Sequence, residues 1–232
     1  MIDELQPQAV IFSDGGPGCR WVGNENGFAG ATNWSFLRAG EVYPGYPKYR
    51  ELQYGHADGN QWVAAECDVS IRPGWFYHPE EDDKVKTVDQ LTDLYYRSVG
   101  HNATLLLNFP VDRNGLIHPT DSLNAVSFHL RVQKELADNL LSSAKVSASD
   151  ERGGQFKVRA VTDGKYDTYW ATNDGVTTAD LTFTFSQPTK MNRVMIQEYI
   201  PLGQRVKSFV VEYKKGDQWL SVKCNEETTT VG

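Results

Sequence analysis

Residues Val10–Gly27 read VIFSDGGPGCRWVGNENG, and the expected fold of the chain follows from this segment. It opens with an apolar run typical of a short, fully buried strand, and everything after Ser13 is predicted to be a loop. In parallel α/β proteins, side chains that leave the carboxyl end of such a strand point into the ligand crevice. Asp14 and Glu25 are therefore candidates for chemistry. The alternatives are a turn cap for Asp14 and a solvated loop position for Glu25.

Composition bounds what the chain can bind. The 232 residues carry a net charge of −7 without a basic run, which argues against nucleic acid or an anionic membrane as partner. No apolar run approaches the length of a membrane span, so membrane insertion is not expected. Aromatic residues make up 12% of the chain and favour a sugar binder, because rigid rings suit sugar C–H surfaces. The three cysteines are far apart and suggest neither a disulfide framework nor a zinc site.

Strands and helices alternate over the first 141 residues. Further strands are expected at 32–37, 62–69 and 104–109. The last of these is apolar without alternation, which is typical of a strand covered on both faces. A capping box at 87–90 begins a helix that Gly100 ends, and a second helix is expected at 121–141. The apolar stripe of that second helix is expected to comprise Leu123, Val126, Leu130, Leu136 and Leu140. This order indicates a parallel sheet, and about half of an eight-stranded barrel fits into the segment.

From Ser142 the hydrophobic pattern changes to period two. Short alternating stretches between turn signals predict an antiparallel β-sandwich. They lie at 179–185, 194–198, 208–213 and 218–223. We therefore place a domain boundary between residues 141 and 142. Both ends look cut, because MIDELQPQ reads as the last turn of a helix and the strand-like run Thr228–Val231 stops at Gly232. We interpret the chain as a piece of a longer protein, with two unpaired sheet edges that favour marginal folding or association.

Polar and aromatic side chains gather after the strand expected at 62–69. Glu66, Arg72, Trp75 and His78 fall within thirteen positions, and Asn108 follows the next apolar strand. A pocket for a polar ligand needs this mixture of charged groups and rings.

Three sequence blocks carry a family resemblance: AVIFSDGGPGCRWVGNENG, WVAAECDVSIRPGWFYH and LLLNFPVDRNGLIHP. In this order they resemble the catalytic barrel of family 29 α-L-fucosidases, in particular the branch that cleaves α-1,3/1,4-linked fucose. The downstream segment from AVTDGKYDTYWAT to WLSV is similar to a discoidin-like (F5/8 type C) sandwich of the galactose-binding-like kind. The expected fold class is therefore α/β, a partial (β/α)8 TIM-type barrel in residues 1–141, followed by an incomplete antiparallel β-sandwich in residues 142–232.

The resemblance implies a retaining glycoside hydrolase that uses two carboxylates, needs no cofactor and acts on fucosylated oligosaccharides. Glu25 of the WVGNE motif matches the acid/base. The nucleophile of the family belongs to a Trp-(Phe/Leu)-Asp-Gly strand ending that this chain lacks. We therefore expect the chain alone to be inactive, and a longer parent, secreted or periplasmic, to supply the nucleophile.

Other acidic residues leave alternatives open. Asp14 could act as nucleophile, since the two acids of a retaining pair lie only ~5 Å apart, but its place in the SDxGP block favours a turn-fixing role. Glu66 could contact the leaving sugar, pair with Arg72, or donate the proton in place of Glu25.

The remaining candidates are substrate contacts. The resemblance implies that Trp75 presents its ring to the fucose. The alternative is that Trp75 is an aromatic residue of the core. Arg72 binds substrate or forms a structural fork to a carboxylate. Trp21, beside the acid/base in its motif, and Asn108, at a strand end, complete the candidate set.

The sandwich contains one candidate metal site. Asp163 and Asp167 flank Gly164 in a tight loop that could hold a structural Ca²⁺, and an Asx turn explains the same residues without metal. Two other functions compete with the fucosidase. A non-catalytic carbohydrate-binding protein is favoured by the missing nucleophile, and a retaining glycosidase of another sugar specificity is disfavoured by the number of matching blocks.

Overall fold

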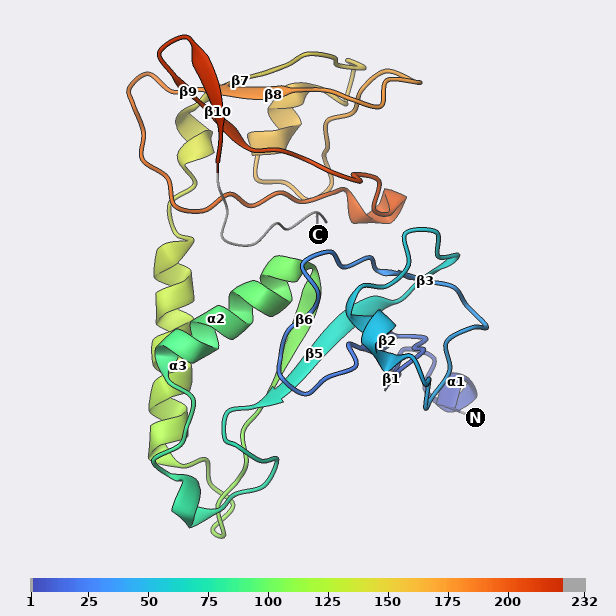
Figure 1. Cartoon of the computed structure of the whole chain (residues 1–232), viewed down its shortest axis with the longest axis vertical. Helices are drawn as coiled ribbons and strands as arrows, with labels where there is room; N and C mark the ends of the chain where they lie inside the picture. The colour runs from blue at the N-terminus through green and yellow to red at the C-terminus, as the bar shows by residue number, and fades with distance from the viewer. Residues whose placement is uncertain (1, 223–232) are drawn as a thin grey trace. The chain divides into compact units, whose positions relative to one another are not determined.

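The computed structural model describes residues 2–222, apart from the side chain of Asp3, and Figure 1 shows the course of the chain. Contacts between residues divide the chain into two compact units, Met1–Val132 together with Gln204–Gly232, and Gln133–Gly203. The strand predicted at Thr228–Val231 lies outside the described residues. Within residues 2–222, no helix combines the length and the apolar character needed to cross a bilayer.

A four-stranded parallel sheet forms the centre of the first unit, in the order β1-β2-β5-β6. Its strands are β1 (Phe12–Ser13), β2 (Cys19–Trp21), β5 (Ala64–Ser70) and β6 (Ala103–Asn108). Helix α2 (Val88–Ser98) connects β5 to β6 and lies across these strands (Figure 1). The predicted alternation of parallel strands and helices is therefore present, in an open sheet.

The other elements are one short helix, one long helix and three antiparallel strand pairs. They are α1 (Ile2–Leu5), α3 (Pro119–Glu135), β3 (Phe36–Leu37) with β4 (Gln61–Trp62), β7 (Lys145–Ala148) with β8 (Leu181–Thr184), and β9 (Glu212–Lys215) with β10 (Gln218–Ser221). Short 3₁₀ turns connect several of them.

The two faces of strand β5 differ in polarity, one being apolar and the other polar. Val69 is buried with Leu91 and Leu94 of α2, because alternate residues of a strand point to the same face. Glu66 and Asp68 alternate with these apolar residues and therefore lie on the opposite face. The buried hydrophobic side chains of residues 2–222 all lie between Cys19 and Leu94, so the hydrophobic core belongs to the first unit. Each fully buried Val, Leu or Ile side chain among them contributes about 1.5–3 kcal/mol of transfer free energy.

The prediction for the opening strand is wrong in two respects. Val10 is 74% exposed and Phe12 41% exposed, because β1 is an edge strand of the sheet rather than a buried one. The predicted loop after Ser13 contains β2, which pairs with both β1 and β5. Three residues are too few for a periodic pattern, so the sequence did not reveal this strand.

Two other predicted strands differ from the structure. The strand expected at 32–37 is reduced to β3, which pairs antiparallel with β4 outside the parallel sheet. The strand expected at 104–109 is β6, but Leu106 is 47% exposed, so the prediction that both faces are covered is wrong. Strand β6 is the second edge of the sheet.

The start of α2 is confirmed, and the helix ends close to the predicted Gly100. Thr87 Oγ1 accepts a hydrogen bond from the Gln90 backbone N–H, and Gln90 Oε1 accepts one from the Thr87 N–H, which completes the capping box. Helix α2 ends at Ser98 with Val99 as its C-cap, so Gly100 follows the cap, and a 3₁₀ turn at Val99–His101 leads to a left-handed Asn102 at φ 59°. The Asn102 amide donates to the Asn33 carbonyl at 3.0 Å, which holds this unusual conformation.

Helix α3 begins and ends earlier than the predicted 121–141. Leu123, Val126 and Leu130 of the predicted apolar stripe are 66%, 57% and 57% exposed, so these three side chains do not belong to the core of the described residues. The helix instead presents Phe128 to the apolar cluster around Val69. Leu136 and Leu140 lie beyond the end of the helix and are 41% and 38% exposed.

The second half of the chain contains antiparallel strand pairs of the predicted kind. The stretch 179–185 contains β8, and 218–223 contains β10. The strand predicted at 194–198 is wrong, since this segment has no regular structure, and the strand at 208–213 is displaced to β9.

Residue Gln204 ties the returning chain to the first unit. Its Oε1 accepts a hydrogen bond from the Ser35 backbone N–H at 2.5 Å, and its Nε2 donates to the Asn33 carbonyl at 3.2 Å. The Gln204 side chain is only 8% exposed. These contacts explain why residues after 203 group with the sheet.

Candidate active site at the carboxyl ends of the parallel strands

Acidic, amide and indole groups meet where β2, β5 and β6 end. Glu25 lies in the turn after β2, Asp68 near the end of β5, and Asn108 at the end of β6. Trp75 lies in the segment after β5. The carboxyl ends of parallel strands share one edge of a sheet, which brings residues distant in sequence together.

The turn that carries Glu25 has a fixed conformation. Gly23 has φ 75°, and a Cβ there would lie 2.1 Å from the Tyr49 carbonyl oxygen, so only glycine fits. Asn24 donates from Nδ2 to the Phe28 carbonyl at 3.1 Å and accepts from the Asn26 N–H at 2.9 Å. Glu25 is therefore exposed at the tip of a turn held by its neighbours.

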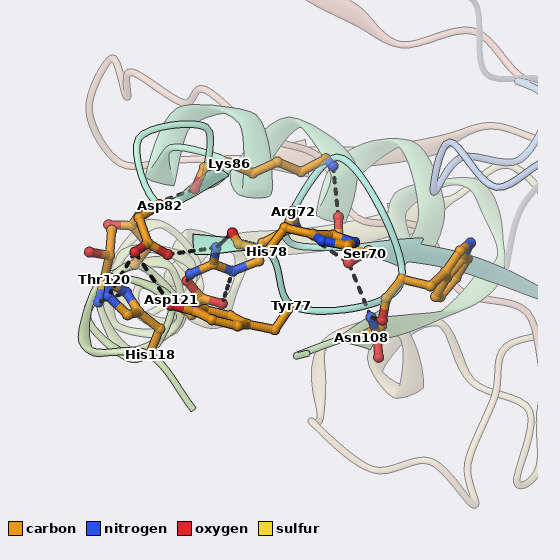
Figure 2. Close-up of polar contacts among 12 residues, drawn as sticks. Ser70, Arg72, Tyr77, His78, Asp82, Lys86, Asn108, His118, Thr120 and Asp121 are labelled. Carbon is orange, nitrogen blue, oxygen red and sulfur yellow. Dashed lines mark hydrogen bonds and ion pairs between the residues drawn. The ribbon is translucent and has the colours of Figure 1, made fainter. Parts of the chain in front are cut away.

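Trp75 links this turn to β6. Its indole Nε1 donates a hydrogen bond to Glu25 Oε2 at 2.9 Å. Its backbone carbonyl accepts one from Asn108 Nδ2 at 3.1 Å, and the same Nδ2 lies 3.1 Å from Ser70 Oγ. Figure 2 shows the Asn108–Ser70 contact. Asn108 thus holds the Trp75 segment, and Trp75 orients Glu25.

A second indole, that of Trp21, is hydrogen-bonded to a second carboxylate, that of Asp68. Trp21 Nε1 donates to Asp68 Oδ1 at 2.8 Å, and Asp68 is 9% exposed. Burial raises the pKa of Asp68, and the charges of Glu25 and Glu66 raise it further. Asp68 is not among the site residues predicted from the sequence. The signal was present, since Glu66, Asp68 and Ser70 recur with the period of two that places them on one face of β5.

Glu66 lies half-buried on the same face. The Cys19 thiol lies 3.5 Å from Glu66 Oε2 and donates to it. Burial, followed by the Glu66 charge, raises the pKa of Cys19 to about 11. The ion pair between Glu66 and Arg72, one of the expected alternatives, is not formed, because Arg72 has other partners.

Arg72 forms a fork between two carboxylates. Its Nε and Nη2 donate to Asp121 at 2.8 and 2.9 Å, and its Nη1 lies 2.9 Å from Asp82 Oδ1. The guanidinium is 0% exposed, and its Cζ lies 4.8 Å from the Tyr77 ring centroid. Figure 2 shows Arg72 between Asp82 and Asp121. These contacts join the Trp75 segment to the start of α3 and use the geometry of a structural fork.

Asp14 occupies the turn-fixing position that its sequence block suggests. Its Oδ2 accepts a hydrogen bond from the Gly45 backbone N–H at 2.7 Å. This bond anchors the long irregular segment after β3 to the end of β1.

The candidate calcium loop forms an Asx turn. Asp163 Oδ1 accepts from the Lys165 N–H at 2.9 Å, and Oδ2 accepts from Thr168 Oγ1 at 2.8 Å. Over residues 2–222, no group of three or more His, Cys, Asp or Glu side chains is arranged to hold a metal ion. Lys157, Arg159 and Lys165 also line the cavity of about 360 Å³ beside Asp163. A calcium ion takes six to eight oxygen ligands, so the Asp163 side chain and these basic neighbours do not by themselves form a calcium site. Calcium binding by Asp163 and Asp167 stays a prediction.

Comparison with known proteins places this geometry in context. The F5/8 type C domain family matches residues 145–232. Alpha-L-fucosidase 1 of Arabidopsis thaliana is 40% identical over 242 residues, covering 100% of this chain and 46% of that protein. A crystal structure from Bacteroides thetaiotaomicron, assigned as an α-L-fucosidase, matches with TM-score 0.93 and 40% identity, over 100% of this chain and 51% of that one.

A ligand-bound relative is also similar. The Ruminococcus gnavus GH29 fucosidase in complex with fucose matches with TM-score 0.81 and 33% identity, over 91% of this chain and 43% of that one. The chain therefore spans about half the length of the relatives it matches.

Proposed function

Because this chain is homologous over its whole length to α-L-fucosidases of glycoside hydrolase family 29, we propose that the intact protein containing it is a retaining α-L-fucosidase. Its substrate would be a fucosylated oligosaccharide with terminal α-1,3/1,4-linked fucose. In this proposal residues 1–141 are part of a (β/α)8 barrel, as the parallel sheet supports, and residues 142–232 are a discoidin-like sandwich, as the F5/8 type C match supports.

The observation that carries the proposal is the hydrogen bond from Trp75 to Glu25 at the strand ends. Glu25 is the acid/base. A carboxylate attacks the anomeric carbon, the glycosidic C–O bond breaks, and Glu25 gives its proton to the leaving oxygen. Glu25 then takes a proton from the water that hydrolyses the fucosyl-enzyme ester. The Trp75 N–H fixes one Glu25 oxygen, which leaves the other free for the proton.

We assign no nucleophile within these residues. The hydrogen bond from Gly45 commits Asp14 to a turn, so we expect the attacking carboxylate from polypeptide outside the 232 residues. Glu66, half-buried beside Cys19, is proposed as a contact to the leaving sugar and is the alternative proton donor.

The substrate contacts follow from the same geometry. Trp75 would cover the fucose ring, since it stands beside the acid/base and is partly exposed. Trp21 would form a second wall beside Asp68. Asn108 and Arg72 would act indirectly, by holding the segment that carries Trp75.

Release of free fucose by the intact protein tests the proposal. The intact protein should release fucose from an α-1,3/1,4-fucosylated trisaccharide and leave an α-1,2-fucosylated trisaccharide as the poorer substrate. The 232-residue chain alone should release none. An intact protein that binds the trisaccharide without releasing fucose would support the competing function of a non-catalytic carbohydrate-binding protein.

A further inference from the structure

Asp68 is a buried acid that the acid/base mechanism does not use. It is 9% exposed and lies on the same face of β5 as Glu66, with Glu25 close enough for its charge to act on it. Burying a carboxylate costs free energy unless it is hydrogen-bonded, and a second and third acid nearby increase that cost. An apolar residue would pack there at a lower cost. Acids that persist in such places are candidates for a functional role.

The register of the sheet brings Asp68 to Trp21. Strands β2 and β5 are parallel, and Trp21 is the register partner of Glu66. Asp68 lies two residues further along β5 on the same face, so the Trp21 indole reaches it diagonally and donates from Nε1 at 2.8 Å. A tryptophan at the end of a strand has two torsions to fix, and this bond selects one ring orientation.

The indoles of Trp21 and Trp75 each donate their N–H to a carboxylate. Trp75 is fixed by donating to Glu25, and Trp21 is fixed by donating to Asp68. Glu25 is exposed, which suits a carboxyl group that reacts with substrate. Asp68 is buried, which suits a carboxyl group that fixes the orientation of a neighbouring side chain.

We propose that Asp68 is a positioning residue of the sugar site, which acts by accepting the Trp21 N–H and so fixing that ring as a binding wall for the fucosylated substrate. This rests on the proposed fucosidase function for its ligand, but the indole anchor itself does not depend on activity.

The anchor is tested first in the intact protein, by a measurement that needs no substrate. The indole N–H resonance of Trp21, assigned through its loss in Trp21→Phe, should be protected from hydrogen exchange in the wild type. It should lose protection in Asp68→Ala and keep it in Asp68→Asn, whose amide oxygen still accepts. Asp93→Ala on α2, an exposed acid paired with Arg97, is the matched control and should leave the resonance unchanged. An unchanged resonance in a folded Asp68→Ala would overturn the anchor.

The positioning role is then tested in the intact protein. Asp68→Ala and Trp21→Phe should each raise KM for the fucosylated trisaccharide by about 10-fold, as the loss of one hydrogen bond to a charged group allows. In both variants kcat should stay within about threefold, because the acid/base is untouched. Asp68→Asn should restore the wild-type KM, and the double variant Asp68→Ala/Trp21→Phe should equal either single variant.

Three results would overturn this role. They are a collapse of kcat with unchanged KM, an Asp68→Asn variant as impaired as Asp68→Ala, and additive effects in the double variant. Failure of the wild-type intact protein to release fucose would overturn the proposed function instead, and the resonance measurement would still decide the anchor.

Discussion

The Trp75 indole nitrogen lies 2.9 Å from Glu25 Oε2 and donates a hydrogen bond to it, although the two residues are separated by fifty positions. Asn108 holds the backbone of Trp75 from the neighbouring strand. The orientation of one exposed carboxyl group therefore depends on three chain segments, and each segment can be tested separately.

Replacing Glu25 should remove proton donation without removing the hydrogen-bonding shape of the side chain. In the intact protein, Glu25→Gln should lower fucose release from the trisaccharide by ~10³-fold or more, since the leaving sugar is a poor leaving group without a proton. The initial rate of fucose release measures this. Glu66→Gln is the matched comparison and should change KM more than kcat. An unchanged rate in Glu25→Gln together with a collapse in Glu66→Gln would move the acid role to Glu66.

Trp75→Phe keeps a ring in place and removes the N–H that orients Glu25. We expect kcat to fall by about 10-fold in the intact protein, because one charge-assisted hydrogen bond is worth roughly 1.5–3 kcal/mol. Asn108→Ala should lower kcat less, since it releases the Trp75 backbone but leaves the indole bond in place. Steady-state kinetics on the fucosylated trisaccharide separates the two. Equal rates for wild type and Trp75→Phe would show that the indole N–H does not orient the acid.

Breaking the Arg72 fork should destabilise the chain, because it leaves a buried charge without its partner. Asp121→Ala leaves a fully buried guanidinium without its main partner, and should lower the free energy of unfolding of the chain by about 3–5 kcal/mol. Urea unfolding followed by tryptophan fluorescence measures the loss. Arg72→Met combined with Asp121→Leu should cost less than Asp121→Ala alone, because the pair then becomes apolar. A double variant that is less stable than Asp121→Ala would contradict this account.

The buried thiol of Cys67 should make the fold sensitive to alkali. Burial raises the pKa of Cys67 from 9.0 to about 12, so the unfolded chain loses this proton first as the pH rises. The stabilising contribution is fully present below pH 9.0 and is lost as the pH rises towards about 12. Urea unfolding at several pH values should show a decline of stability above pH 9.0 that is shallower in Cys67→Ala. The same slope in both proteins would assign the decline to other groups.

The exposed stripe of α3 should promote association of the chain. Leu123, Val126 and Leu130 are each more than half exposed on one helix face, and apolar patches of this kind lower solubility. Leu123→Lys with Val126→Glu should reduce the sedimentation coefficient measured at high concentration towards that of a monomer. Asp93→Asn on α2, where the acid pairs with Arg97 of the same helix, should have no such effect. A wild-type chain that is monomeric at all concentrations would contradict the prediction.

Local chemistry could be predicted from the sequence, and contacts between distant segments could not. The capping box of α2 depends on four consecutive residues and is found as expected. Strand β2 was missed because it has three residues and contains Arg20, which reads as a loop residue. The structure buries that guanidinium completely, with hydrogen bonds to the Leu52 and Val63 carbonyls and to Asn33 Oδ1. The three residues of the strand contain no pattern that predicts hydrogen-bond acceptors so distant in the sequence.

The same limit applies to the candidate site. Glu25 and Trp75 were each selected from their motifs, but the bond between them depends on the conformations of two separate turns. Asn108 is predicted from the sequence as a substrate contact, and in the structure its amide donates hydrogen bonds to Ser70 Oγ and the Trp75 carbonyl. These two contacts depend on the register between β5 and β6, which the sequence does not show. Asp68 was overlooked beside Glu66, although the alternation of polar residues along β5 was visible in the sequence.

The bond from Gln204 to the Asn33 carbonyl spans 171 positions and has a consequence for biosynthesis. A ribosome must extend the chain as far as Gln204 before the Asn33 carbonyl and the Ser35 N–H can meet this side chain. Such distant pairing slows folding, since the loop must close before the contact stabilises it. During translation the Asn33–Ser35 segment therefore lacks these two hydrogen bonds until Gln204 is made. A nascent chain arrested before that residue should remain a better target for chaperones and proteases than one that contains it.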